Sequence, residues 1–323
     1  ENMAGNKLTG TITNKQGLAL RTVRWAPSDA QLAAVEGKTD EVGKRILFFV
    51  HGHGAHLEFE LLRIPEPGAE PVYEGSWAEY FNAQGIHVYG IDNQGCGGSE
   101  ALYGVPWYVE RFDDYVDDVL LYVRHVVDSL PGPEQRAAKL YIAGLSAGGC
   151  IALNCVMREP ALFESGGLIL MAPMISLEKV SKKSPNKYML PVARLLSWLV
   201  PTAPLVATDK NEVYPEIQKM WELDARTSRG AYTRVRSAYE YILACDRLMG
   251  ALRGGGVLSG QRVLLFHSER DTMVDPEGSK ALVALSASED MTVRWVNNMW
   301  HVLTKEPGCD EVVAEICRWV LER

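Results

Sequence analysis

Ser146 lies in a glycine-flanked pattern that could make it a nucleophile. The segment Gly144-Leu145-Ser146-Ala147-Gly148 has the form G-x-S-x-G, in which a serine occupies a sharp turn between a strand and a helix. Side chains two positions before or after the serine would crowd such a turn, so Gly144 and Gly148 suit it. The following helix would point its free N–H groups at the site. We predict that Ser146 is a nucleophile, and the alternative is a turn serine with chance glycine neighbours.

A serine hydroxyl needs a base, and the base needs an acid that orients it. In the fold that carries this turn, the acid and then the histidine follow the serine along the chain, each after a late strand. Asp271 follows the apolar run 261–268, and His301 follows the run 291–297. We therefore predict Asp271 as the acid and His301 as the base. Asp275 is a second candidate for the acid, but it precedes a predicted helix and could cap that helix instead.

Two backbone N–H groups should stabilise the oxyanion that forms when a serine attacks a carbonyl. One is expected from Ala147, and the other from the loop after the third strand. That loop reads HGHGAH over residues 51–56, where Gly52 and Gly54 let the backbone turn and His53 would supply the N–H. Metal binding is the alternative for its three histidines. No carboxylate or cysteine cluster accompanies them, so we predict no metal site.

The elements that must position these residues follow an α/β pattern. Short, almost wholly apolar runs suit strands buried on both faces of a parallel sheet. These runs are residues 45–52, 85–92, 139–146, 166–173, 261–268 and 291–297. Helical patterns lie between or after them at residues 76–84, 112–130, 148–160, 276–287 and 308–323. An alternating pair of segments, 8–14 and 18–25, predicts a hairpin at the start. The predicted fold is a mostly parallel central sheet flanked by helices.

The alternation of strands and helices stops between about residues 174 and 256, where only helical pieces with prolines occur. We predict an α/β core formed by residues 1–173 and 257–323, with residues 174–256 inserted as a helical cap, or lid. The apolar stretch 188–207 contains Arg194 and three prolines, so we expect an amphipathic cap helix and not a membrane span. We also expect the cap to contact a membrane surface peripherally.

Composition narrows the function classes. The chain has 323 residues and is 47% hydrophobic, enough for a large core. A net charge of −8 argues against a nucleic-acid-binding protein. The six cysteines form neither a CxxC pair nor a disulfide framework, and the chain does not begin with a signal-peptide pattern. We therefore predict a cytoplasmic protein with reduced thiols.

These segments resemble the serine hydrolases of the α/β-hydrolase fold, in the branch of monoglyceride lipases and lysophospholipases. The resemblance spans almost the whole chain and rests on FFVHGHGAH, VYGIDNQGCGGSE, YIAGLSAGGCIAL, LILMAPM, RDTMVD and HVLTKEP. The segment LEFELLRIPEPGAEPVYEGSW is similar to lysophospholipase-like esterases of apicomplexan parasites. The resemblance implies a triad of Ser146, Asp271 and His301, no cofactor, and a mobile helical lid over an acyl tunnel.

Several positions depart from the pattern of this family. Leu145 stands where the family usually has histidine before the serine, and Cys96 replaces the histidine of its D-x-x-G-H-G motif. Monoglyceride lipases tend to place Glu, Arg and a second His around the glycerol, and the matching positions here are Ala55, Phe59 and Thr304. A site without those hydrogen bonds would not favour glycerol strongly. The sequence therefore supports ester hydrolysis and leaves monoacylglycerol specificity open.

The expected function is hydrolysis of a carboxylic ester with a hydrophobic acyl group, such as a lysophospholipid, a monoacylglycerol or a related small-molecule ester. A serine peptidase or amidase on the same fold is the first alternative. It would need acidic lid residues to hold a substrate ammonium, and the candidates are Asp209, Glu212 and Glu216. A non-catalytic ligand receptor is the second alternative, although such a receptor need not keep a complete triad.

Overall fold

The structure contains the predicted central sheet, and its parallel strands all end on the same side of it. The structure is a computed structural model that describes residues 6–35, 44–181, 188, 190–207, 210–228 and 232–323. Its sheet has eight strands in the order β1-β2-β4-β3-β5-β6-β9-β10. The strands are β1 Asn6–Thr13, β2 Ala19–Ala26, β3 Arg45–Val50, β4 Ile86–Ile91, β5 Lys139–Leu145, β6 Gly167–Met171, β9 Arg262–His267 and β10 Asp290–Trp295. All six predicted apolar runs are strands, with bounds within two residues of those expected.

The direction of the strands matches the expected fold. The six strands from β4 to β10 pair in parallel, whereas the hairpin of β1 and β2 is joined to β4 in antiparallel fashion. Strands β3, β4 and β6 are buried along their whole length, as continuous apolar runs predict. The expectation of two buried faces is wrong for β10. It is an edge strand and Trp295 is 38% exposed, because an edge is covered from fewer directions.

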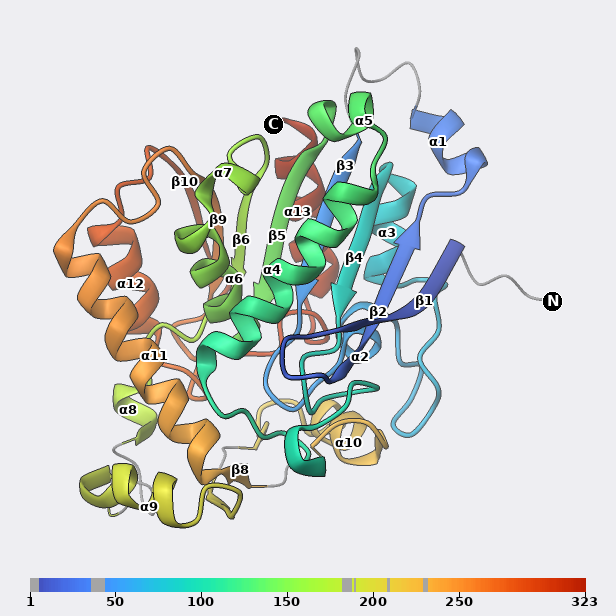
Figure 1. Cartoon of the computed structure of the whole chain (residues 1–323). Coiled ribbons are helices and arrows are strands. Elements are labelled where there is room, and N and C mark those ends of the chain that lie inside the picture. The colour runs from blue at the N-terminus through green and yellow to red at the C-terminus, as the bar shows by residue number, and fades with distance from the viewer. Residues whose placement is uncertain (1–5, 36–43, 182–187, 189, 208–209, 229–231) are drawn as a thin grey trace.

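Helices cover both faces of the sheet (Figure 1). On β3, Ile46, Phe48 and Val50 join one core cluster, whereas Leu47 and Phe49 join the other, because successive side chains point to opposite faces. The first cluster includes α4 Phe112–Ser129, α6 Ala147–Arg158, α11 Val235–Gly254 and α12 Pro276–Leu285. The second includes α2 Leu57–Leu61, α3 Trp77–Ala83 and α13 Cys309–Leu321. Shorter helices are α1 Asp29–Val35, η1 Leu102–Gly104, α5 Gly132–Ala137 and α7 Pro160–Phe163.

The predicted cap, residues 174–256, is called the inserted segment below. Its described residues include a small sheet that the sequence did not predict. Strand β7, Pro204–Val206, pairs in antiparallel fashion with β8, Thr233–Arg234. The expectation of helical pieces alone is therefore wrong, because strands this short show no recognisable alternation. The helices before α11 are α8 Glu178–Ser181, η3 Leu190–Val192, α9 Ala193–Leu199 and α10 Pro215–Leu223. Stretch 188–207 thus contains a helix of only seven residues, and no helix among the described residues is long and apolar enough to cross a membrane.

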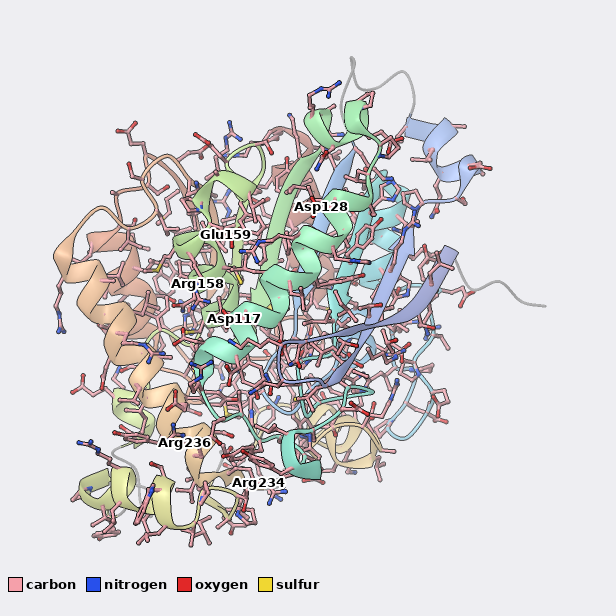
Figure 2. The ribbon with its side chains drawn as sticks, in the orientation of Figure 1. Asp117, Asp128, Arg158, Glu159, Arg234 and Arg236 are labelled. Carbon is pink, nitrogen blue, oxygen red and sulfur yellow. The ribbon has the colours of Figure 1, made fainter. Side chains whose placement is uncertain are left out.

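Helix α11 connects the inserted segment to the core. It begins beside β8, and its buried residues Tyr241, Cys245 and Leu248 belong to the first core cluster. Figure 2 shows Arg234 and Arg236 where this helix begins. The Arg236 Nε donates to the carbonyl of Glu110 at 2.8 Å, so this end is also tied to the loop before α4. The boundaries predicted for the cap remain predictions.

Ion pairs fasten the surrounding elements to α2. The Glu58 carboxylate accepts hydrogen bonds from Arg21 of β2 at 2.7 Å and from Arg226, in the loop after α10. Arg21 also pairs with Asp92 at 3.0 Å, and Asp92 accepts the N–H of Leu57 at the start of α2. The hairpin, the inserted segment and the end of β4 therefore meet at one helix, immediately after the predicted oxyanion loop.

Candidate active site

Ser146 occupies a strained turn between β5 and α6. Its backbone has φ 56° and ψ −120°, a conformation that costs a non-glycine residue about 1–3 kcal/mol. A methyl group at Gly144 would lie 2.2 Å from the carbonyl oxygen of Gly148, and one at Gly148 would lie 2.1 Å from that of Val50. The Ser146 N–H also donates to the carbonyl of Met171 on β6 at 2.9 Å. Neighbouring backbone therefore holds the turn, and larger residues at 144 or 148 would push it apart.

The structure brings Asp271 and His301 together from two different loops. His301 Nδ1 lies 2.6 Å from Asp271 Oδ2, and both side chains are buried. The other oxygen of Asp271 accepts the N–H groups of Met273 at 2.8 Å and Val274 at 3.1 Å. These contacts fix the carboxylate and leave Nε2 of His301 as the ring nitrogen free of Asp271. Ser146 and His301 line the same pocket.

Charge and burial shift the pKa values of Asp271 and His301 in opposite directions. Burial alone would raise the pKa of Asp271, but the charge of His301 and hydrogen bonds from His267 and His301 hold it at about 2. Burial alone would lower the pKa of His301, but the Asp271 carboxylate raises it above its ordinary value, with Glu306 and Glu60 acting in the same direction. The site therefore favours an ionised Asp271 beside an imidazole that readily accepts a proton.

Two residues that the sequence analysis missed hold the pair in place. His267, at the end of β9, lies with Nε2 3.1 Å from Asp271 Oδ2 and Nδ1 2.6 Å from Ser279 Oγ. The carboxylate of Glu306 accepts the N–H groups of His301 at 3.0 Å and Val302 at 2.7 Å. The glutamate of the motif HVLTKEP was a signal for this second contact. Nothing in the spacing of the chain pointed to His267.

Asp275, the alternative acid, lies at the start of α12. Its side chain accepts the N–H of Glu277 at 3.2 Å and pairs with Lys179 at 3.0 Å. This is an N-cap, the other role that the sequence allowed for it. The structure thus places Asp271, and not Asp275, in contact with His301.

The loop after β3 lies beside Ser146. Gly52 and His53 line the pocket with Ser146, and Gly54 adopts φ +70°. Nδ1 of His53 lies 2.7 Å from the Tyr241 hydroxyl oxygen, and its Nε2 lies 3.2 Å from the Thr233 hydroxyl oxygen. These two contacts hold the ring against the inserted segment. Burial lowers the pKa of His53 to about 4, which favours a neutral ring.

Ala147 is the first residue of α6. Its N–H therefore has no acceptor one turn earlier in the helix.

The other histidines of this loop also bond to protein groups. His51 Nε2 accepts the N–H of Asn93 at 2.8 Å, and its Nδ1 lies 2.7 Å from the carbonyl of Gly52. His56 Nε2 lies 3.0 Å from Asp224, and its Nδ1 accepts the N–H of Phe59 at 3.2 Å. Protein partners therefore explain the rings for which metal binding was the alternative.

The pocket at Ser146 is a cavity of about 130 Å³, several times the space that one water molecule needs. The core contributes Leu145, Met273, Trp300 and Val302 to its wall, which gives Leu145 a place in the site. The inserted segment contributes further residues, namely Asn211, Ile217, Gln218, Trp221 and Ser228. The cavity thus lies between the core and the inserted segment, and most of its wall is apolar.

The three positions matched to the glycerol-binding residues of monoglyceride lipases hold side chains that pack or bond within this protein. Ala55 and Phe59 are fully buried in a small apolar cluster with Ile64. The ring of Phe59 packs edge-on against Trp221, with ring centres 5.2 Å apart. Thr304 donates its hydroxyl to Glu60 at 2.6 Å. Cys96 is also buried, and burial raises the pKa of its thiol to about 12.

Comparisons with known proteins identify the family of this chain. Residues 71–308 match the sequence model of the family described as serine aminopeptidase, S33, and this range includes all three predicted triad residues. The chain belongs to this family. It is similar to human monoglyceride lipase, with 26% identity over 87% of this chain and 83% of the relative. It is also similar to a monoacylglycerol lipase of Mycolicibacterium smegmatis, with 23% identity over 76% of this chain and 81% of the relative.

The fold agrees with solved structures of α/β hydrolases. A soluble variant of monoglyceride lipase from Saccharomyces cerevisiae, solved with a substrate analogue, superposes with a TM-score of 0.74 at 16% identity. The match covers 100% of this chain and 96% of the other. At this identity the likeness shows the fold, and the chain is an α/β hydrolase. The resemblance to apicomplexan esterases remains a prediction.

Replacing the two candidate acids one at a time should separate their roles. Asp271→Asn should lower kcat by about 10⁴-fold, because the amide favours the wrong tautomer of the imidazole. Asp275→Asn should leave kcat nearly unchanged, because asparagine is also a good N-cap. Steady-state hydrolysis of a p-nitrophenyl ester measures both variants. Equal losses in the two variants would contradict the assignment of Asp271.

The acid limb of the pH profile should lie above pH 6.5, the ordinary pKa of histidine. His301 must be neutral to take the proton of Ser146, and its raised pKa keeps it protonated to a higher pH than a free imidazole. Activity should therefore fall as the pH drops through that raised value. The measurement is kcat/KM of the wild-type protein between about pH 5 and pH 9. A limb at or below 6.5 would refute the expectation.

Proposed function

We propose that this protein is a serine hydrolase that cleaves carboxylic esters of hydrophobic acyl groups through an acyl-enzyme intermediate on Ser146. The observation that carries the proposal is the buried 2.6 Å contact between His301 and Asp271 in the loops beside the strained Ser146 turn. Ser146 is half-buried and shares a pocket with His301. A serine that shares a site with a histidine oriented by a carboxylate is the arrangement needed to activate a hydroxyl.

The proposed reaction has two halves. His301 Nε2 takes the proton of the Ser146 hydroxyl while the oxygen attacks the ester carbonyl, and Asp271 stabilises the resulting imidazolium. The N–H groups of His53 and Ala147 hold the oxyanion. His301 then gives the proton to the departing alcohol, which leaves an acyl group on Ser146. Water, activated by the same histidine, releases the acid and restores the serine.

Three observations support an ester over a peptide substrate. The relatives reported above are named as monoglyceride and monoacylglycerol lipases, although the family description names an aminopeptidase. The pocket wall is mostly apolar, which suits an acyl chain. Glu212 and Glu216, the acidic residues considered for binding a substrate ammonium, are exposed and do not line the pocket, and Asp209 lies outside the described residues. We infer an ester of a monoacylglycerol, a lysophospholipid or a related small molecule.

An exposed apolar surface on α9 supports peripheral contact with membranes, the source of such substrates. Trp198 is 75% exposed, Leu199 56% and Leu195 54%. Tyr188 and Leu205, near the two ends of the same stretch, are also exposed. Aromatic and aliphatic side chains on a short surface helix are typical of segments that lie in the interface of a bilayer. We propose that this face rests on the membrane.

We propose a cytosolic location for the protein, on the basis of its cysteines. All six are free thiols, and five of them are buried. Secreted domains commonly pair their cysteines, whereas cytosolic proteins keep them reduced.

The reaction is tested with wild type and Ser146→Ala. The wild type should hydrolyse p-nitrophenyl esters, lysophospholipid and monoacylglycerol, and the variant should lose activity by about 10⁴-fold or more, because alanine has no hydroxyl to attack the ester. An aminoacyl amide with a free amine is measured alongside. A higher kcat/KM for the amide, or full activity in the variant, would contradict the proposal.

The membrane contact is tested with a matched pair of leucines. Leu195→Asp should release the protein from phospholipid vesicles in a sedimentation assay, because a charged side chain is costly in the apolar interface. Leu8→Asp is the control, since Leu8 is 59% exposed but lies on the edge strand β1. Hydrolysis of a soluble short-chain ester should stay unchanged in both. Equal vesicle binding of the two variants would rule out this face as the contact.

A further inference from the structure

Glu60 is a buried carboxylate in the pocket that the reaction proposed above does not use. It belongs to α2, is 2% exposed, and lines the same cavity as Ser146 and His301. An ionised carboxylate is costly to bury unless donors satisfy its oxygens. Its partners therefore indicate what it does at this place.

One set of partners belongs to the loop that carries His301. The Thr304 hydroxyl donates to Glu60 Oε2 at 2.6 Å, three residues after the catalytic histidine. The next residue, Lys305, donates its Nζ to the backbone carbonyls of Glu60 and Leu62, both at 2.8 Å. The histidine loop is thus bound to α2 through the side chain and the main chain of the same residue.

A second partner belongs to the predicted oxyanion loop. The backbone of Gly52 faces the Glu60 carboxylate and favours its ionised form. A methyl group at Gly52 would lie 3.5 Å from Ser146 Cβ and 3.7 Å from Glu60 Oε1, so the nucleophile and the carboxylate flank the same glycine. Glu60 therefore reaches the loop whose next residue, His53, is expected to hold the oxyanion.

The sheet alone does not set the spacing of these two loops. The oxyanion loop leaves β3, whereas the histidine loop leaves β10 at the far edge, with β5, β6 and β9 between them. The histidine loop must return across those strand ends to meet Ser146. A side chain that contacts both loops can fix their separation where no ladder of backbone hydrogen bonds does.

We propose that Glu60 is a positioning residue that clamps the oxyanion loop to the histidine loop and keeps a negative charge beside His301. This role rests on the proposed function, because it is defined by the proton transfer from Ser146 to His301. Glu60 does not exchange a proton with the substrate. Its contacts fix the position of the oxyanion loop relative to His301, and its charge favours the imidazolium that forms during attack.

The charged groups around the histidine support the electrostatic part of this role. Asp271, Glu306 and Glu60 all raise the pKa of His301. Burial raises the pKa of Glu60 itself, whereas Thr304, Lys305, Gly52 and His56 favour its ionised form. The Thr304 hydroxyl donates to the carboxylate and the backbone of Gly52 faces it, an arrangement that favours an ionised Glu60.

The experiment measures how fast a fluorophosphonate labels the protein at each pH, so it needs no knowledge of the natural substrate. Glu60→Gln removes the charge and keeps the shape. Its acid limb should move down by about half a pH unit, and its plateau rate should fall by about tenfold. Thr304→Val removes one tie and keeps the charge, so it should lower the plateau without moving the limb. Glu66→Gln, an exposed carboxamide substitution in the following loop, is the matched control and should change neither.

The proposal is overturned if Glu60→Gln leaves the limb in place, whether or not the plateau and the melting temperature fall, since a purely structural role would do no more. If that variant does not fold, the labelling rates of Thr304→Ser and Thr304→Val decide whether Glu60 acts as a clamp. Wild-type labelling in the serine variant with a slow valine variant supports the clamp, and two wild-type rates overturn it. A wild type that labels at Ser146 but hydrolyses no ester would refute the proposed function and leave this measurement valid.

Discussion

The strained backbone at Ser146 is the constraint on which the rest of the site depends. A residue with φ 56° between a strand and a helix persists only where its surroundings over-determine it. Here α6 comes so close to the backbones of β5 and β3 that there is no space for a methyl group at Gly144 or Gly148. Because of this close packing, Ser146 lies at the end of β5 and α6 begins directly after it. The same edge receives the loops from β3, β9 and β10 that carry the remaining groups.

Buried carboxylates form the second layer of this arrangement. Asp271 faces the imidazole of His301, Glu306 holds the backbone of its loop, and Glu60 joins that loop to α2. Each is buried, and each accepts hydrogen bonding that offsets the cost of removing its charge from water. Together they raise the pKa of His301, so the positive charge that the proposed attack would place on it meets preorganised negative charge.

Local sequence patterns predicted the core, but they could not predict contacts between residues that are distant in the sequence. The G-x-S-x-G turn and the apolar runs are short-range signals. They predicted the turn at Ser146 between a strand and a helix, and all six apolar strands. His267 and Glu60 gave no such signal, because their roles arise only when β9 and α2 are packed against loops distant in the sequence. The strands β7 and β8 were missed because two or three residues carry no periodicity. The exposure of β10 depends on its place at the sheet edge, which composition does not encode.

Mapping the covalent adduct of a fluorophosphonate shows whether Ser146 is the nucleophile of the pocket. Ser228 also lines the cavity, so a second serine is within reach of the reagent. Our account predicts a single adduct by intact mass and its location on the peptide that contains Ser146. An adduct on Ser228, or no adduct under conditions in which the protein is folded, would contradict it.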